Sequence, residues 1–172
     1  MLKKGSFLLV LFCSFCNFAM AQSQSQESNL KAAFIYNFTK YIDWDNGDAE
    51  NKFIIGIMGT SSIDGPINEI AKNSFIKNKR IVLKHFSNAE DISYCNILFI
   101  PRGNGIPLQS VLEKINKGVL TISEEPGFAR QGSAINFVVN NDKLKFEINL
   151  KALNSAGLKA GSQLLKLAVI VN

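Results

Sequence analysis

The stretch VLTISEEPGFARQGSAINFVVNNDKLKFEI, residues Val119–Ile148, decides the fold of this chain. It begins with a short β-branched run, Val119–Ile122, and continues with a polar loop, Ser123–Gly132. Two runs that alternate apolar and polar residues follow, Ala134–Val139 and Leu144–Ile148, and an Asn-Asn-Asp-Lys turn joins them. Alternation with a period of two on both sides of such a turn predicts a β-hairpin.

The hairpin also predicts part of the core. Alternating residues of one strand point to the same side, so the apolar positions of each run share a face. These positions are Ile135, Phe137 and Val139 in the first run and Leu144, Phe146 and Ile148 in the second. We expect Phe137, Phe146 and Ile148 to be core residues and not site residues.

The chain before this stretch predicts alternating strands and helices. The expected strands are Phe53–Met58, Arg80–Phe86 and Ile97–Ile100, and the expected helical segments are Ile63–Lys72, Asn88–Ile92 and Pro107–Asn116. After the hairpin we expect two short helices, Leu150–Ala156 and Gln163–Ala168. This order predicts an α/β fold: a single-domain, Rossmann-like, mostly parallel sheet flanked by helices, with an antiparallel hairpin near the C-terminus.

A first helix is expected from Ser28 or Asn29 to about Ile42. Its apolar stripe is Leu30, Ala33, Phe34, Phe38 and Tyr41. Ile35 and Tyr36 lie off that stripe, so the helix is apolar around much of its girth. Either the helix is sandwiched in the core, or Ile35 and Tyr36 belong to a second face that meets a partner.

The first 21 residues have the features of a secretory signal peptide. Lys3 and Lys4 precede an apolar run, Phe7–Phe18, and Ala19-Met20-Ala21 forms a small-x-small cleavage site. A membrane anchor would need about 20 apolar residues. We therefore expect cleavage after Ala21, a periplasmic protein, a disordered leader at 22–27 and one domain at 28–172.

Cleavage changes the charge and the cysteine count. Removing Lys3 and Lys4 lowers Lys+Arg from 19 to 17 against 14 acidic residues, so the net charge falls from +5 to +3. That charge is too weak and scattered to indicate a nucleic-acid partner. Of three cysteines, only Cys95 remains, so the mature chain cannot form an internal disulfide. We expect Cys95 to be a buried, slowly reacting thiol; the alternative is a reactive thiol or an intersubunit bond.

The sequence contains no strong catalytic constellation. The single histidine, His85, lies in an expected strand, and no nucleophile elbow or phosphate-binding glycine motif is present. Glu124 and Glu125 are adjacent and point apart unless the loop folds them together. Zinc and copper sites use several histidine or cysteine ligands, whereas the mature chain has one of each, so we expect neither metal. The acidic loop 43–50 resembles a calcium loop only in composition. We expect no enzyme activity, no metal and no cofactor.

The loop Ser123–Gly132 is the best candidate for a binding site. It carries Glu124, Phe128 and Arg130 beside two glycines. It follows the carboxyl end of a strand, where open α/β sheets bind ligands. The alternative is an ordinary surface connection.

Four segments together resemble a known family. They are KAAFIYNFTKYIDW (Lys31–Trp44), CNILFI (Cys95–Ile100), VLTISEEPGFARQGSAINFV (Val119–Val138) and KLKFEINLKALNSAGLKAGSQLLKLAVIV (Lys143–Val171). These segments are similar, in the same order, to the YfiR family, also called DUF4154. The last two segments are the specific ones.

The resemblance implies a small periplasmic α/β protein with a Rossmann-like core that can dimerise, and our leading hypothesis is a non-enzymatic regulator of a membrane signalling protein. Its implied partner is the periplasmic sensory domain of an inner-membrane diguanylate cyclase, whose repression limits cyclic di-GMP and biofilm, or of a sensor kinase. Repressor-type members carry paired cysteines, whereas this chain keeps only Cys95 after cleavage, which puts disulfide switching within one subunit in doubt. The competing hypotheses are a periplasmic small-ligand sensor acting with a sensor kinase, and a hydrolase of unfamiliar type.

Overall fold

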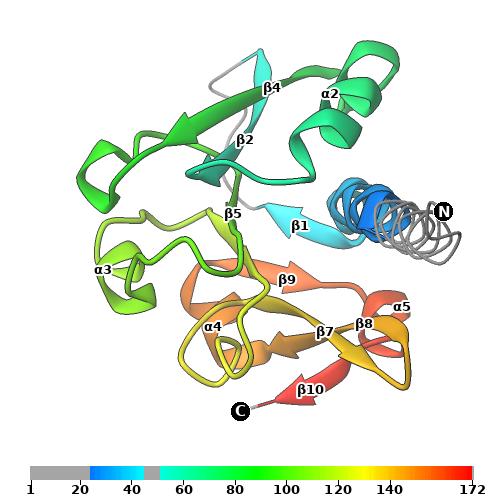
Figure 1. Ribbon diagram of the computed structural model, residues 1–172, viewed down its shortest axis with the longest axis vertical. Coiled ribbons are helices and arrows are strands. Elements are labelled where there is room, and N and C mark those ends of the chain that lie inside the picture. The colour runs from blue at the N-terminus through cyan, green and yellow to red at the C-terminus, as the bar shows by residue number, and fades with distance from the viewer. Residues whose placement is uncertain (1–23, 45–50, 172) are drawn as a thin grey trace, which may run out of the picture.

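The computed structural model describes residues 24–44 and 51–171 (Figure 1). The predicted signal peptide and the acidic residues at 45–50 lie outside the described residues. Within the described part, no helix is long and apolar enough to cross a membrane.

An eight-stranded sheet forms the centre of the fold, in the order β10-β8-β7-β6-β5-β2-β4-β3. Its strands are β2 (Lys52–Met58), β3 (Phe75–Ile76), β4 (Lys79–Phe86), β5 (Ile97–Ile100), β6 (Leu120–Ser123), β7 (Ile135–Asn140), β8 (Lys143–Asn149) and β10 (Val169–Val171). The pairs β2–β4, β2–β5, β5–β6, β6–β7 and β8–β10 are parallel, whereas β7–β8 and β3–β4 are antiparallel. The predicted mostly parallel α/β sheet with a late hairpin is confirmed.

The remaining elements are short apart from the first helix. The N-terminal helix covers residues 24–41. The others are α2 (Asp64–Asn73), α3 (Leu108–Leu112), α4 (Leu150–Ser155), α5 (Ser162–Leu165) and a 3₁₀ turn at Ala89–Asp91. A second, two-stranded sheet pairs β1 (Ile42–Trp44) with β9 (Leu158–Ala160). Figure 1 shows the N-terminal helix and α3 at opposite sides of the molecule.

The β7–β8 hairpin closes with a tight two-residue turn. Asn141 and Asp142 both have positive φ, 50° and 57°. That conformation matches the right-handed twist of the flanking strands and is tolerated best by glycine, asparagine and aspartate. The turn places Phe137 opposite Phe146 and Ile135 opposite Ile148. All four side chains are buried, so the predicted core face of the hairpin is confirmed.

One face of the large sheet packs against the N-terminal helix. Phe38 lies 6.0 Å from Phe137 and 5.0 Å from Phe146, measured between ring centroids. Ile35 is fully buried in the same core. Leu30 and Tyr41, which we predicted to be part of the core stripe, are 46% and 39% exposed. The helix is therefore rotated relative to the prediction, and it packs through positions 28, 32, 35, 38 and 39.

The opposite face holds a second core, around Leu98 and Ile100, which α3 contributes to with Leu108 and Val111. Cys95 is fully buried in it. Burial raises the pKa of the Cys95 thiol to about 12, although the positive charge of Lys84 acts in the opposite direction. The expected buried thiol is confirmed.

Several element boundaries differ from the predictions. Residues 24–27, which we expected in a disordered leader, belong to the helix, and Glu27 forms an ion pair one turn along with Lys31. Helix α3 ends at Leu112, well before the expected Asn116. Helix α5 is also shorter than predicted. The strands β1, β3, β9 and β10 are two or three residues long, too short for a periodic pattern to indicate.

Candidate functional site

The loops that follow β2, β5 and β6 meet at one edge of the sheet and border a pocket of about 330 Å³. The N-terminal helix and the β7–β8 hairpin complete its wall. Its lining residues are Gln24, Glu27, Ser28, Lys31, Thr60, Ser61, Ser62, Pro101, Arg102, Glu124, Phe137, Val138, Val139 and Leu144. Strands β4 and β5 flank β2 on opposite sides, so the crevice at their carboxyl ends is the usual ligand position in an open α/β sheet.

An ion-pair cluster lies at the centre of this pocket. Lys31 Nζ is 2.5 Å from Glu124 Oε1 and 2.6 Å from Glu27 Oε1. The side chains of Lys31 and Glu124 are only 13% and 12% exposed. Burial by itself would lower the Lys31 pKa, but the hydrogen bonds and charges of Glu124 and Glu27 outweigh it, and the pKa is raised. The cluster fixes the helix against the loop after β6.

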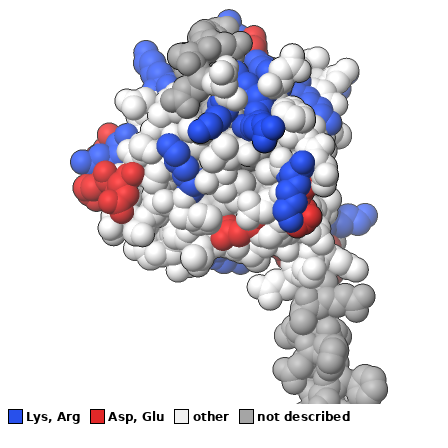
Figure 2. All heavy atoms as spheres, turned by 90° about the horizontal axis from the view of Figure 1, so that it is seen from above, with Lys and Arg blue, Asp and Glu red and all other residues white. Residues whose placement is uncertain are grey.

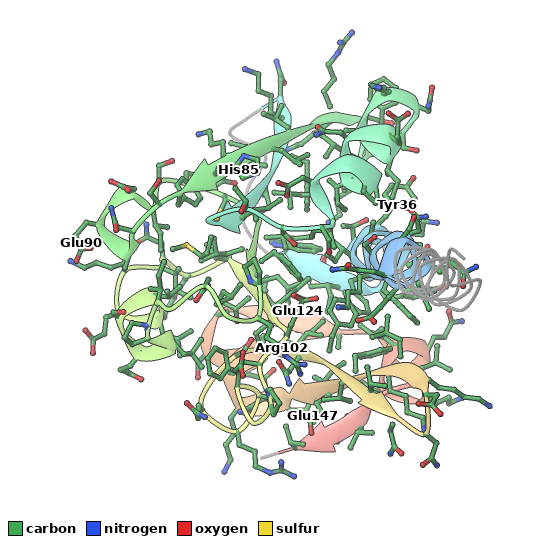
Figure 3. All side chains as sticks on the ribbon, in the orientation of Figure 1. Tyr36, His85, Glu90, Arg102, Glu124 and Glu147 are labelled. Atoms are coloured by element: carbon green, nitrogen blue, oxygen red, sulfur yellow. The ribbon has the colours of Figure 1, made fainter. Side chains whose placement is uncertain are left out.

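The two adjacent carboxylates of this loop act together on the neighbouring loop. The backbone N–H of Arg102 donates to Glu124 Oε2 at 3.2 Å, and that of Gly103 donates to Glu125 Oε2 at 3.3 Å. Figure 3 shows Arg102 and Glu124 side by side near the middle of the molecule. The Arg102 side chain is left exposed at the pocket rim. The two carboxylates therefore position the loop that follows β5.

Buried polar side chains hold the loop Ser123–Gly132 and its flanks on the sheet. The Ser123 hydroxyl donates to Asn136 Oδ1 at 2.7 Å, and the Asn149 amide donates to the Ala129 carbonyl at 2.7 Å. The backbone N–H of Ala134 donates to Thr121 Oγ1 at 2.8 Å. These polar groups are buried and satisfied, so they specify one loop conformation.

The buried polar side chains continue from β7 onto β8. Asn136 lies opposite Glu147 in the hairpin register, and its amide donates to Glu147 Oε2 at 3.4 Å. Arg130 Nη1 is 3.9 Å from Glu147 Oε1. The Arg130 side chain is 65% exposed and the Glu147 side chain 12%. Arg130 thus covers the outer end of this buried polar row, away from the pocket.

One exposed apolar side chain lines the pocket, and another lies on the helix beside it. Val139 is 62% exposed and Leu30 is 46% exposed. Phe34, one helical turn after Leu30, packs 6.1 Å from Phe137 and 5.7 Å from Phe146. Val139 follows Phe137 on the same strand face. Val139 lines the pocket, and Leu30 directly precedes Lys31 on the helix that forms part of the pocket wall; we call this pair the apolar rim.

The structure separates the predicted site residues. Glu124 lines the pocket, whereas Phe128 is half-buried against the second core and Arg130 lies over Glu147. Ile35 is a core residue, and the prediction that it faces a partner is wrong for this fold because its side chain has no exposed surface. Tyr36 is half-buried, with Lys40 Nζ 4.8 Å from its ring centroid.

Sequence reasoning missed Lys31 and Arg102. The spacing of Glu27 and Lys31, four residues apart on a helix, predicts their pairing with each other but not with Glu124, which lies far along the chain. Arg102 follows the carboxyl end of a buried strand, and this position could have identified it as a candidate site residue from the sequence.

The described residues contain no group of three or more His, Cys, Asp or Glu side chains that could hold a metal ion. His85 is exposed, and its Nε2 lies 3.1 Å from Asp64 Oδ2. That carboxylate oxygen also accepts from the backbone N–H of Ser61 at 3.3 Å. The pair lies on α2 and β4 and ties the start of α2 to the sheet.

Comparisons with solved structures show the fold alone. A conserved domain protein from Vibrio cholerae O1 biovar El Tor is similar with a TM-score of 0.56 at 9% identity, over 84% of this chain and 60% of that one. This chain thus spans less than two thirds of the Vibrio protein. An ABC domain from Streptococcus pneumoniae, solved in complex with L-Trp, gives a TM-score of 0.46 at 14% identity, over 70% and 56% of the two chains.

A search of curated proteins found no match. The sequence itself matches the DUF4154 family, described as YfiR/HmsC-like, over residues 28–169. That match spans almost all described elements, from the N-terminal helix to the start of β10. The chain therefore belongs to the YfiR/HmsC-like family.

Proposed function

We propose that this protein is a non-enzymatic periplasmic regulator that binds and represses an inner-membrane signalling protein. Membership of the YfiR/HmsC-like family suggests a regulator of cyclic di-GMP signalling. The partner would be the periplasmic sensory domain of a diguanylate cyclase or of a sensor kinase. In the cyclase case, repression lowers cyclic di-GMP and restrains biofilm formation.

The apolar rim beside a buried ion pair is the observation that carries this proposal. Leu30, next to Lys31 in the helix, and Val139, in the lining of the same pocket as Lys31 and Glu124, are both exposed. Binding energy in protein interfaces concentrates in a few apolar or arginine anchors that become desolvated, surrounded by polar contacts. Arg102, which is exposed and lines the same pocket, offers a cation to a carboxylate of the partner. The surface thus has the composition of a small regulatory interface.

A deletion strain tests the function. Loss of the gene should raise cyclic di-GMP and biofilm, and wild-type protein should restore both. The double variant Leu30→Asp/Val139→Asp should be exported and folded but fail to restore them, since each charge would be buried in the interface. Tyr41→Asp, on the same helix and 39% exposed, is the matched control and should complement. Unchanged cyclic di-GMP in the deletion strain would remove the cyclase form of the proposal.

A direct test is capture of the membrane partner. Crosslinking in intact cells through a photoreactive residue at position 139 should recover an inner-membrane protein with a periplasmic sensory domain. Crosslinking from position 94, an exposed tyrosine remote from the pocket in sequence and fold, is the control. Recovery of the same protein from both positions would argue against a specific rim interface.

We also propose a homodimer. Strand β10 is an edge of the large sheet, and Leu167, Val169 and Ile170 beside it are 71%, 45% and 43% exposed. An exposed apolar edge strand is a template for pairing with another chain. Two copies of β10 related by a twofold axis would form one continuous sheet.

The pocket also supports a second function, the binding of a small ligand as the sensed signal. Its volume of about 330 Å³, its hydroxyls at Ser61 and Ser62 and its apolar wall at Val139 suit a small polar molecule. Thermal shift against nucleotides, amino acids and aromatic metabolites tests this function. A shift that disappears in Glu124→Gln would support it, and the absence of a shift with every compound would oppose it.

A further inference from the structure

A row of three exposed side chains crosses β3, β4 and β2 near the amino ends of the long strands. Phe75 on β3 pairs with Arg80 on β4, and Arg80 pairs with Lys52 on β2. Residues in register across neighbouring strands point to the same face of a sheet. Phe75 is 58% exposed, and Arg80 and Lys52 are also exposed. The row therefore presents one aromatic ring and two cations to solvent.

Further cations extend this row. Lys84 is exposed and lies four residues after Arg80, hence on the same face of β4. Lys77 and Asn78 form the β3–β4 turn with positive φ of 48° and 63°, which carries Lys77 at the tip of the hairpin. Figure 2 shows Lys and Arg side chains gathered over this end of the molecule. We call Lys52, Phe75, Arg80 and Lys84 the basic face.

Among the described residues, acidic side chains do not neutralise the positive charges of this row. Asp43 lies 3.8 Å from Lys77, at the hairpin tip, and is itself 66% exposed. The adjacent segment 45–50 contains Asp45, Asp48 and Glu50 and lies outside the described residues. The basic face uses no residue of that segment. Binding measurements on the wild-type chain include the negative charge of that segment.

We propose that the basic face docks this protein onto the surface of an anionic phospholipid bilayer. Lysine and arginine near an anionic membrane are attracted to its surface potential. A phenylalanine that protrudes among them inserts at the level of the headgroups and supplies an apolar contribution. Long cationic side chains extend past the aromatic ring, so charges and ring reach the same plane.

The basic face and the pocket lie at different places on the sheet. Lys52, Phe75 and Arg80 lie at the amino ends of β2 and β4, and Lys84 lies four residues further along β4, whereas the pocket lies beyond the carboxyl ends of β2, β5 and β6. A membrane contact at the first end leaves the second end free. Docking therefore restricts the search for a membrane-embedded partner to two dimensions without covering the pocket. The advantage for a membrane-embedded partner rests on the proposed function, whereas the binding of lipid by the basic face does not.

Vesicle sedimentation tests the inference. A chain beginning at Gln22 contains every described element and lacks the apolar run at 7–18, which would bind any bilayer. It should bind vesicles of equal parts phosphatidylglycerol and phosphatidylcholine and not vesicles of phosphatidylcholine alone. Binding should be lost near 0.5 M salt, where the Debye length is only about 4 Å.

Charge variants decide whether the basic face carries the binding. Lys52→Gln/Arg80→Gln/Lys84→Gln should weaken partitioning by roughly fivefold for each cation removed. Phe75→Ser should weaken it several-fold and leave the salt dependence unchanged. The control, Lys143→Gln/Lys145→Gln/Lys151→Gln, removes three exposed lysines elsewhere and should retain most of the binding. Circular dichroism checks that each variant is folded.

Three results would overturn the inference. They are no binding of the wild-type chain to phosphatidylglycerol vesicles, equal binding to both vesicle types, and an equal loss in the control variant. An equal loss of binding in the control variant would mean that binding depends on the net charge of the protein and not on the basic face. Because no partner protein is present in this assay, a negative result leaves the complementation and crosslinking results for the apolar rim unaffected.

Discussion

Lys31 Nζ lies 2.5 Å from Glu124 Oε1 and thereby joins the first helix of the fold to the loop after β6. Glu124 also accepts the backbone N–H of Arg102 from the loop after β5. A single carboxylate therefore connects three segments that are distant in sequence. Any ligand or partner that engages Glu124 must compete with Lys31, so binding and the position of the helix are coupled.

Lys31→Met should reduce the free energy of unfolding by about 1–3 kcal/mol at neutral pH, because it leaves Glu124 without its cation. The raised pKa of Lys31 gives the pH dependence. A lysine with a raised folded-state pKa stabilises the protein fully below its ordinary value of 10.5, and the contribution is lost as the pH rises through the folded-state pKa. Urea unfolding of both proteins measures this difference, which should be present at neutral pH and shrink as the pH rises above 10.5. If the difference in unfolding free energy between the two proteins stayed unchanged at high pH, it would contradict a stabilising role for the charge of Lys31.

Ile35→Asp and Leu30→Asp should behave differently although both lie on one helix. Ile35 is fully buried, so an unpaired carboxylate there should prevent stable folding. Leu30 is 46% exposed, so the same change should alter stability by about 0.5 kcal/mol or less. Thermal unfolding checks both. Equal destabilisation would mean that the helix has the rotation predicted from sequence, with Leu30 in the core.

Phe137→Ala should cost about 3–5 kcal/mol, because it opens a cavity between Phe34, Phe38 and the sheet. Val139→Ala, on the same strand face but 62% exposed, is the control and should be nearly neutral. Denaturant titration of the two variants gives the comparison. A small loss of stability in Phe137→Ala would mean that the opposite face of this strand forms the core.

Cys95 should resist modification in the folded protein. Its thiol is fully buried and its pKa is raised to about 12, so little thiolate forms and little reagent reaches it. Labelling with a maleimide at about pH 8 should be slow for the native protein and fast after denaturation. A non-reducing gel should show no covalent dimer. Fast native labelling, or a reductant-sensitive dimer band, would instead indicate an intersubunit bond.

Ile170→Lys should shift a homodimer toward monomer without unfolding the protein. Its side chain is 43% exposed on the edge strand β10, so the cation is solvated in the monomer and obstructs strand pairing in the dimer. Sedimentation velocity measures the shift. Leu30→Lys is the control for a charge on another apolar position. A dimer that persists in Ile170→Lys and dissociates in Leu30→Lys would move the interface to the helix.

The parts of the fold with a strong local pattern could be predicted from the sequence. The alternation around Phe137 and Phe146 specified the hairpin, and the Asn141-Asp142 turn fixed its register. The rotation of the first helix could not be predicted in the same way. Its packed positions include Ser28 and Thr39, whose hydroxyls donate to backbone carbonyls at 3.0 Å and 2.6 Å and can therefore be buried. A stripe defined by apolar residues alone omits them.

The candidate site was only partly predictable for a related reason. The loop Ser123–Gly132 stood out by composition, and Glu124 does line the pocket. Its companions Phe128 and Arg130 follow a tight turn that carries them to the other side of the sheet, where Asn149 and Glu147 hold that part of the chain. The partners of Glu124 come from the first helix and from the loop after β5, and only tertiary packing brings them together.

The two-stranded sheet has a consequence for how the molecule is made. It pairs Ile42 with Ala160 and Trp44 with Leu158, so it joins the exit of the first helix to a segment near the end of the chain. A chain that crosses a membrane amino end first presents residues 24–44 long before residues 158–160 arrive. During that interval the aromatic side of the helix, around Phe38, has neither the β7–β8 hairpin nor β9 to cover it. The first helix therefore completes its packing only after the end of the chain has arrived, and its aromatic side stays uncovered until then.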